Sequence, residues 1–261
     1  MKGDGALEVV RAPNLEKALL LLSDGRPWRL LAGGTHALDD LGARATHVLS
    51  LQSLRPELRF VFVDAHRFRA GALATLRDLA TSAGVREKLP LLSSAARAQA
   101  TLAIQHRATL CGTLVEGLGA VPAALYALDA TFDVRSSLGS RPGQTVVTAR
   151  RPGPSELLTH VHIAIPDGRA RQVFAAAPEG VSVAGVLVKA RRRPLAARLF
   201  AASEKARPLR LLRTEQAMAL GRGGWANAIT KDLDPLVPAR RALAVTAAVA
   251  QHLSEALASM R

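Results

Sequence analysis

Two short segments contain the residues with the clearest capacity for chemistry. In residues 30–38 an apolar run ends in the turn Gly33-Gly34-Thr35. Glycine permits positive φ and carries no side chain, so several backbone N–H groups can converge on one anion, and the threonine hydroxyl adds a donor at the rim. Residues 100–114 form a second turn of small residues and hydroxyls. The first turn therefore predicts a phosphate-binding site, and the second is its candidate partner.

Other residues with chemical potential favour no further site. His160 and His162 alternate along an expected strand and share one face, a geometry that could hold a metal, but no third ligand stands nearby in the sequence. We therefore predict no metal site. His36 follows the first turn and either contacts a phosphate or caps the next turn. No Ser/His/Asp or Cys/His arrangement is recognisable, so no side chain is predicted to be catalytic.

Composition limits the class of protein. The chain has 261 residues, 49% of them hydrophobic, which is enough for one large or two modest domains. Its single cysteine, Cys111, can form no internal disulfide and by itself no iron–sulfur or zinc site. No apolar run reaches the roughly 20 residues of a membrane span, and the first residues lack the apolar stretch of a secretory signal, so a cytoplasmic protein is expected.

The net charge of +14 raises the question of nucleic acid. A basic surface attracts phosphate, but only 3% of the residues are aromatic, and the sequence has no helix-turn-helix, zinc-finger or RNA-recognition signature. We therefore predict no nucleic-acid partner. Electrostatic attraction to a partner protein stays open.

The elements around the first turn form a small α/β unit. Asn14 is a good N-cap for an amphipathic helix that ends near Gly25, and strands follow at residues 28–32 and 47–51. The turn Gly33-Gly34 thus lies at the carboxyl end of a strand, the position that ligands favour in α/β sheets.

The rest of the chain shows strand and helix patterns around one polar interruption. Residues 136–154 are rich in Gly, Ser, Pro and Arg and predict a loop or domain junction. Before it, we expect strands at 59–64, 68–72 and 131–135 and helices at 76–83, 90–100 and 122–128. After it, we expect strands at 157–165, 171–177, 181–189 and 195–202 and helices at 215–220 and 240–257, which together would form a second domain.

Several segments resemble one known family. The two turns, in this order, resemble the A-G-G-T/H and T-I/L-G-G-N turns with which the flavoprotein (medium) subunit of molybdenum hydroxylases grips FAD. This family includes the medium subunits of xanthine dehydrogenase and carbon monoxide dehydrogenase. Residues 12–19, 69–79 and 122–130 are similar to further segments of the same subunit. The resemblance covers nearly the whole chain.

The resemblance implies an α+β fold in two parts. A two-subdomain FAD-binding domain of the PCMH/VAO type would occupy residues 1–150, with subdomains at about 1–52 and 53–150. A smaller C-terminal α/β domain of the carbon monoxide dehydrogenase flavoprotein type would occupy residues 155–261.

The resemblance also implies that the chain transfers electrons with FAD as its cofactor. Electrons would come from a molybdopterin-binding large subunit through the 2Fe–2S clusters of a small iron–sulfur subunit, and FAD would deliver them to an external acceptor. The chain is thus expected to be an oxidoreductase subunit that is not complete alone. The resemblance assigns the cofactor contacts to residues in and around the two turns: Leu31, Ala32, Gly33, Gly34, Thr35, His36, Ala37, Ala100, Ala108, Thr109, Cys111, Gly112 and Thr113.

The second turn departs from the family pattern. Cys111 stands where the family usually has glycine, Thr113 where it usually has asparagine, and Ala108 where it often has glycine. Residues 115–121 are shorter than the family's A-S-P-x-A/S-D-L stretch and lack its Ser and Asp. These departures leave an alternative open, which is a cofactor-free structural subunit that retains the flavoprotein fold.

Overall fold

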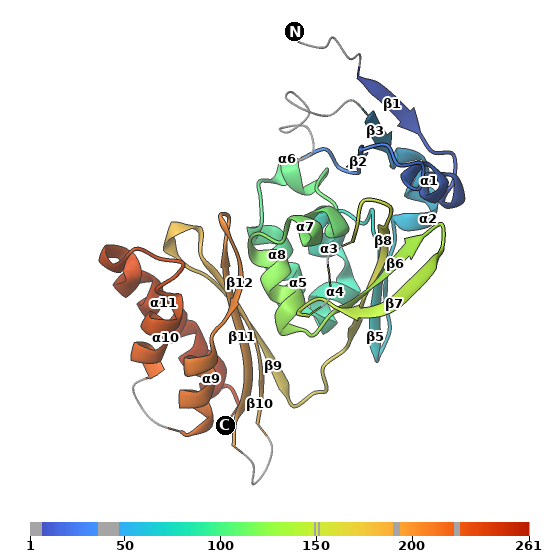
Figure 1. Cartoon of the computed structure of the whole chain (residues 1–261). Helices are drawn as coiled ribbons and strands as arrows, with labels where there is room; N and C mark the ends of the chain where they lie inside the picture. Colours follow the sequence, from blue (N-terminus) through green and yellow to red (C-terminus); the bar gives the residue numbers. More distant parts are fainter. Residues whose placement is uncertain are drawn as a thin grey trace.

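The computed structural model describes residues 7–35, 47–148, 150, 152–189, 194–221 and 225–260. The described elements form three sheets with helices packed between and beside them, which confirms the expected α+β class (Figure 1). Among the described helices, no single one is long and apolar enough to cross a bilayer. Helices α7 (Leu110–Glu116) and α8 (Ala120–Ala127) meet the length and composition of a span only as a pair, and this pair is bent by 91°.

The first sheet is parallel and carries the glycine turn. Its strands pair in the order β1 (Glu8–Arg11), β3 (His47–Ser50), β2 (Trp28–Leu31). Helix α1 (Leu15–Leu22) begins at Asn14, whose side chain accepts a hydrogen bond from the Lys17 amide at 2.9 Å, as the N-cap pattern predicts. Parallel pairing brings the carboxyl ends of β2 and β3 to one edge, and residues 32–35 leave the sheet at that edge.

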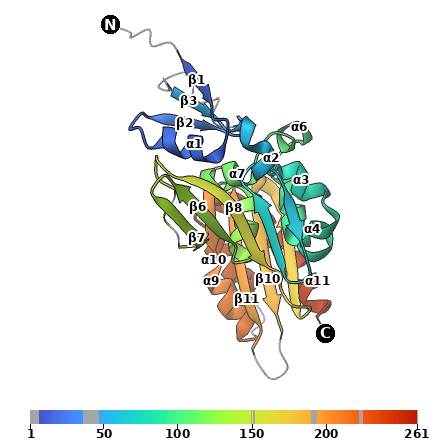
Figure 2. The same cartoon turned by 90° about the vertical axis from the view of Figure 1, so that its right-hand side faces the viewer.

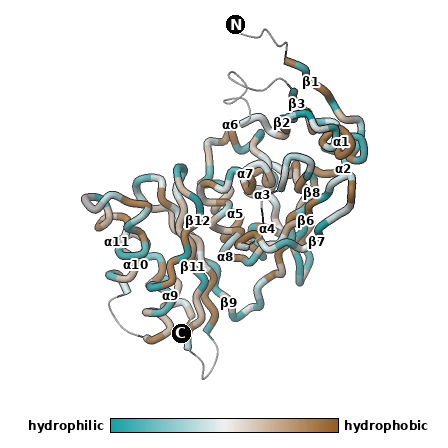
Figure 3. Tube along the Cα trace, in the orientation of Figure 1, coloured by the Kyte–Doolittle hydropathy of each residue, from teal (hydrophilic) through white to brown (hydrophobic). Residues whose placement is uncertain are grey.

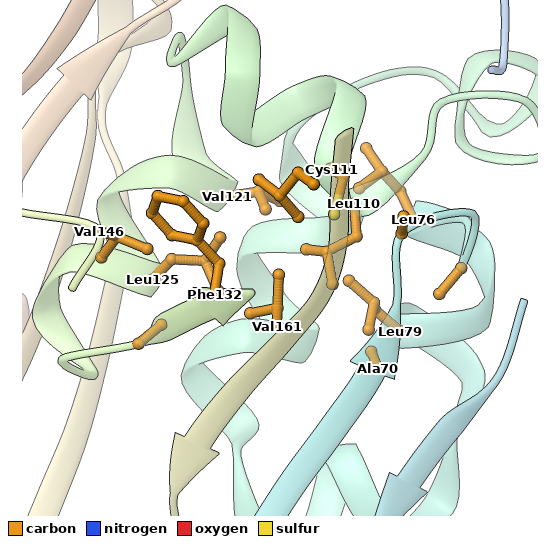
Figure 4. Close-up of a cluster of buried hydrophobic side chains, with 14 of the residues drawn as sticks. Ala70, Leu76, Leu79, Leu110, Cys111, Val121, Leu125, Phe132, Val146 and Val161 are labelled. Carbon is orange, nitrogen blue, oxygen red and sulfur yellow. The ribbon is translucent and has the colours of Figure 1, made fainter. Parts of the chain in front are cut away.

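The second sheet has five antiparallel strands and forms one wall of the central core. Its strand order is β4 (Val61–Val63), β5 (Arg67–Gly71), β8 (Leu157–Ala164), β6 (Thr131–Ser136), β7 (Gly139–Thr145). In β6 the buried Phe132 and Val134 alternate with Asp133, which lies on the opposite face. Side chains from β6 and β8 meet leucines of α3 (Leu76–Thr81), α7 and α8 in one buried cluster (Figure 4).

Helices fill the space beside this sheet. They are α2 (Arg55–Leu58), α3 (Leu76–Thr81), α4 (Ala83–Lys88), α5 (Pro90–Ala98), α6 (Leu102–Gln105), α7 and α8. The expected helices at 76–83, 90–100 and 122–128 thus form as α3, α5 and α8. Helices α5 and α8 lie between the five-stranded sheet and the third sheet (Figure 1).

Strand β7 forms where the sequence predicted a loop over residues 136–154. Its residues, GSRPGQT, include two glycines and a proline, which are depleted in strand interiors. β7 lies at the edge of the sheet and pairs only with β6. No described strand pairs with its outer side, so Pro142, which has no backbone N–H, interrupts no strand pairing there. An edge position tolerates such residues, and the local pattern therefore gives no sign of the strand.

Strand β8 lies in a different sheet from the one expected. The pattern at residues 157–165 correctly predicts a strand, but the expectation that it belongs to the second domain places it with the wrong partners, because it pairs with β5 and β6. Alternation of apolar residues defines a strand and its buried face and does not identify the partner strand, so this assignment was wrong. We accordingly propose that the first domain includes β8 and ends in the connection to β9 (Ala170–Ala176).

The third sheet is antiparallel and has the order β12 (Ala206–Arg210), β11 (Ala196–Ser203), β10 (Ser182–Val188), β9. Helices α9 (Leu212–Ala219) and α11 (Ala239–Ala258) pack on one face, α10 (Trp225–Leu233) packs against these two helices, and α5 and α8 contact the other face. Hydrophobic residues run along the helices and strands where these layers meet (Figure 3). Strand β12 and helix α10 were not expected from the sequence.

Candidate functional site

A cleft lies where the carboxyl end of β2, the start of α7 and the segment before β8 meet. Its empty volume is about 890 Å³, including the part open to solvent. The first turn contributes Ala32, Gly33, Gly34 and Thr35 to its lining, and the second contributes Thr109, Cys111 and Gly112. The two segments that the sequence singled out therefore line one cleft.

Gly33 is the point at which the two turns touch. A Cβ atom built on Gly33 would lie 1.9 Å from the carbonyl oxygen of Arg107 and 3.3 Å from the Cα of Ala108. No side chain fits in that space, because real Cβ atoms do not approach backbone atoms so closely. The sequence suggested that Gly33 is needed for the approach of a phosphate. The structure shows a further reason, which is the close packing of the first turn against the second.

The first turn directs its backbone toward the cleft. Gly34 has φ +72°, in the left-handed region that glycine adopts without strain. Within the described part of the chain, no residue accepts a hydrogen bond from the amides of Gly33, Gly34 or Thr35. The carbonyl of Ala32 accepts a hydrogen bond from the Gln52 side chain at 2.6 Å, which ties the start of the turn to the residues after β3.

The second turn leads into the N-terminus of α7, and the first amides of this helix are already engaged. Thr109 is the N-cap, and its hydroxyl accepts from the Gly112 amide at 3.2 Å. The amides of Leu110 and Cys111 donate to the carbonyls of Ala74 and Ala72. These hydrogen bonds anchor α7 to the loop after β5, so the amides of Leu110, Cys111 and Gly112 are not available to a ligand.

Cys111 is buried at the wall of the cleft. Only 6% of its surface is exposed, and it packs beside Leu110 in the central cluster (Figure 4). Burial raises the pKa of the Cys111 thiol well above its usual value, because the thiolate would lose its hydration. The side chain is therefore a neutral thiol, and nothing in its surroundings activates it as a nucleophile.

Four of the residues assigned from the resemblance do not line the cleft. Leu31 belongs to strand β2, and Ala100 follows α5, where its carbonyl accepts from the Gln105 side chain. Ala108 is buried against Gly33. Thr113, which replaces the family's asparagine, donates its hydroxyl to the Thr109 carbonyl at 3.0 Å and so stays within its own helix. His36 and Ala37 lie outside the described residues.

The structure adds lining residues that sequence reasoning missed. One group comes from the strands, helices and loops around the turns: Leu30, Leu51, Ala72, Leu73, Val115 and Glu116. A second group comes from the segment that leads into β8: Pro152, Gly153, Glu156, Leu157 and Leu158. This last group reaches the cleft because β8 pairs between β5 and β6. No local signal in the sequence could have placed it there.

Glu156 holds the segment before β8 in place. Its carboxylate accepts hydrogen bonds from the Gly153 amide at 2.6 Å and from the guanidinium groups of Arg141 and Arg150, each at 3.0 Å. The amide of Gly153 and then these arginines lower the pKa of Glu156, and burial opposes them. The ionised carboxylate thus closes the short loop that forms one side of the cleft.

His160 and His162 share a face, as expected, but they lie on the side of the five-stranded sheet that faces away from its helices. His162 Nε2 is 2.8 Å from Asp133 Oδ2, and His160 Nδ1 is 3.8 Å from the same atom. No group of three or more His, Cys, Asp or Glu residues in the described ranges could hold a metal ion.

The residues of the cleft fit a flavin dinucleotide. The first turn presents backbone amides with no Cβ at Gly33 and Gly34, which is the kind of concave N–H surface that receives a pyrophosphate. Leucines from β2, the residues after β3 and β5, and the start of β8 provide an apolar wall of the kind that a planar ring system requires. The pyrophosphate and the isoalloxazine ring of FAD therefore have suitable surroundings in this cleft.

Comparison with known proteins agrees with this fit. Residues 5–164 match the family described as the FAD binding domain in molybdopterin dehydrogenase. The chain is 28% identical over 169 residues to the glyceraldehyde dehydrogenase medium chain of Sulfolobus acidocaldarius. The aligned region covers 61% of this chain and 60% of that one. It is 30% identical over 138 residues to the xanthine dehydrogenase FAD-binding subunit of Escherichia coli O157:H7, which covers 50% of this chain and 47% of that one.

The chain thus spans between 47% and 60% of the length of these relatives. A solved structure of carbon monoxide dehydrogenase from Hydrogenophaga pseudoflava has a similar fold, with a TM-score of 0.80 and 21% identity over 97% of this chain and 98% of that one. The matched family covers both turns and all five strands of the second sheet. The chain therefore belongs to the family of FAD binding domains of molybdopterin dehydrogenases.

Proposed function

We propose that this chain binds FAD in the cleft between its two turns and is the electron-transferring flavoprotein subunit of a molybdopterin-dependent hydroxylase or dehydrogenase. The observation that carries the proposal is the packing of Gly33 against Arg107, which brings the two segments to one cleft. Bound FAD would supply the redox chemistry, accepting electrons from a partner's iron–sulfur clusters and delivering them to an external acceptor.

The residues of this chain would bind and orient the cofactor rather than move protons. In this proposal the amides of residues 33–35 hold the pyrophosphate, and the hydroxyl of Thr35 adds a donor beside them. Leu30, Leu157 and Leu158, which line the cleft, would contact the ring and keep water from it. Thr109 caps α7 and so keeps Cys111 and Gly112 at the wall. No acid or base is required of any of these side chains.

The proposed partners are a molybdopterin-binding large subunit and a small subunit with 2Fe–2S clusters, and the proposed compartment is the cytoplasm. Support for partners comes from relatives that are themselves described as a medium chain or a subunit. The chain has one cysteine, so it cannot supply the ligands of a cluster. Nucleic acid is not among the proposed partners.

Flavin content tests the proposal. The native complex is expected to be yellow and to release FAD on denaturation, measured by absorption and by chromatography of the released cofactor. A colourless complex that takes up no added FAD would contradict it.

Such a result would favour a cofactor-free structural subunit. Two observations support that alternative: Cys111 adds bulk at the wall of the cleft, and the first amides of α7 are engaged within the protein.

A further inference from the structure

The five-stranded sheet has one face that no described helix or strand covers. Figure 2 shows β5, β8 and β6 in front, with the helices and the C-terminal sheet behind or beside them. The side chains on this face include Phe62, Arg69, Asp133, Arg135, His160 and His162, and we term this surface the outer sheet face. Strand register places them side by side, since Phe62 pairs with Arg69, Arg69 with His162, and Asp133 with His160.

Arginine and aromatic groups lie against one another on this face. The Arg69 guanidinium lies 5.6 Å from the centre of the Phe60 ring, and the His160 ring lies 5.8 Å from the same ring. Phe62 is 48% exposed, so about half of this aromatic side chain is open to a partner. Exposed aromatic and arginine side chains together are typical of protein interfaces.

The outer sheet face has positive charge that its own residues do not balance. The five strands contain four arginines, no lysine and one carboxylate, that of Asp133. Arg67 pairs with Asp64, and Arg141 pairs with Glu156. Within the described residues, no carboxylate lies within ion-pair distance of Arg69 or Arg135, and Asp133 is already engaged by His162 and the Gly143 amide.

The surroundings of His160 agree with the excess of arginine on this face. Burial and then the nearby Arg69 guanidinium lower the pKa of His160, and these effects exceed the opposing effect of Asp133. Arg69 thus contributes a positive potential beside His160, and this potential would favour an approaching carboxylate.

We propose that the outer sheet face is a docking surface for an acidic protein surface, with partner carboxylates pairing with Arg69 and Arg135 and partner apolar groups covering Phe62. This inference rests on the proposed function, because it assigns the surface to another subunit of the complex. Charge complementarity of this kind sets the rate and specificity of association. Arginine is the cation that interfaces favour, whereas lysine is depleted in them.

Nucleic acid is the other anionic partner to consider. Sheets that bind single strands use aromatic rings that are open for stacking on bases. Here the Arg69 guanidinium and the His160 ring already lie near the Phe60 ring, at 5.6 and 5.8 Å from its centre. The observations therefore favour a protein partner.

Charge reversal provides the test. The double variant Arg69→Glu/Arg135→Glu and its neutral form Arg69→Gln/Arg135→Gln are compared with Arg171→Glu/Arg207→Glu. The control pair changes two exposed arginines of β9 and β12, for which no described carboxylate lies within ion-pair distance, so the net charge is matched. Flavin content and thermal melts of each variant establish that the fold is intact.

Two measurements are made at the same ionic strength. The first is the Kd of the isolated chain for poly-L-glutamate, with an oligothymidylate of equal charge in parallel. The second is the Kd of the chain for its co-purified partner subunits. The double reversal is expected to weaken both poly-L-glutamate and subunit binding about tenfold or more, the neutral form less, and the control pair little.

Equal losses in the reversal and control variants would overturn the proposal, as would unchanged subunit binding in the double reversal. Tighter binding of oligothymidylate than of poly-L-glutamate, lost on reversal, would assign the face to nucleic acid instead. If the wild-type chain assembles with no subunit, the proposed function fails, and the titration with poly-L-glutamate still decides whether this face selects acidic polypeptides.

Discussion

Gly33 is the residue on which the contact between the two turns depends. In Gly33→Ala, the new Cβ atom would collide with the Arg107 carbonyl, 1.9 Å from its ideal position, so one turn must move away from the other. We expect FAD affinity to fall at least tenfold and the free energy of unfolding to fall by about 1–3 kcal/mol, the usual cost of overpacking. Flavin titration and denaturant melts measure the two effects separately.

The matched control is Gly168→Ala. Nothing lies within 4 Å of a Cβ atom built at Gly168, so the free energy of unfolding is expected to change by no more than about 0.5 kcal/mol, with FAD affinity unchanged. Wild-type flavin affinity in Gly33→Ala would show that the contact between the turns does not shape the site.

Cys111 is the substitution that most clearly separates this chain from the family's second turn. Cys111→Gly is expected to raise FAD affinity, because it removes bulk where the wall of the cleft approaches the cofactor. The variant loses a buried side chain and gains glycine within α7, so the free energy of unfolding is expected to fall by about 1–2 kcal/mol.

Cys111→Ala separates the effect of the thiol from that of glycine flexibility. If the alanine and glycine variants both bind FAD no better than wild type, the thiol does not crowd the cofactor. The departure from the family pattern that weakens FAD binding would then be the short connection between α7 and α8.

At the scale of an element, the segment before β8 depends on an ionised Glu156. Its folded pKa is lowered, so the stability that it contributes is present above the unfolded pKa of about 4.3 and is lost as pH falls through the folded pKa. Glu156→Gln is therefore expected to lower the free energy of unfolding by about 1–3 kcal/mol at pH 7. The difference from wild type should shrink as pH falls below about 4.

Denaturant melts of both proteins from pH 7 to pH 3 measure this dependence. Glu204→Gln, at an exposed position in the turn between β11 and β12, is the control and is expected to show no comparable difference. A Glu156→Gln effect that stays constant across this range would mean that the side chain acts by packing rather than by charge.

For the whole molecule, we expect assembly with other subunits. Co-expression with molybdopterin-binding and iron–sulfur subunits should give one complex on size exclusion, with substrate turnover only when all three are present. The physical reason is that this chain has one cysteine and so lacks the ligands of an iron–sulfur cluster. Full turnover by the isolated chain would contradict this prediction.

Local patterns in the sequence predicted many of the elements correctly. The N-cap at Asn14 begins α1, and the strand pair expected at residues 59–72 forms as β4 and β5. The helices at 76–83 and 240–257 form as α3 and α11. These features depend on capping and apolar periodicity, which act between residues that are close in the chain.

Elements whose stability comes from distant contacts were missed. Strand β7 is held by its pairing with β6 despite its glycines and proline. The helix α7 forms where only a turn was expected, because the loop after β5 accepts its first amides. In both places the local preference is weak and the tertiary contact decides.

The sequence by itself determined the two turns and the family that they resemble, because these depend on residue type and local spacing, and the resemblance implied the α+β class. Only the tertiary structure decided that β8 joins the five-stranded sheet, that Glu156 and Leu158 reach the cleft, and that Thr113 and Ala100 do not. Strand pairing joins residues far apart in the chain, and the alternation of apolar residues does not specify the partner strand. For the same reason, only the folded chain shows that Gly33 packs against the second turn.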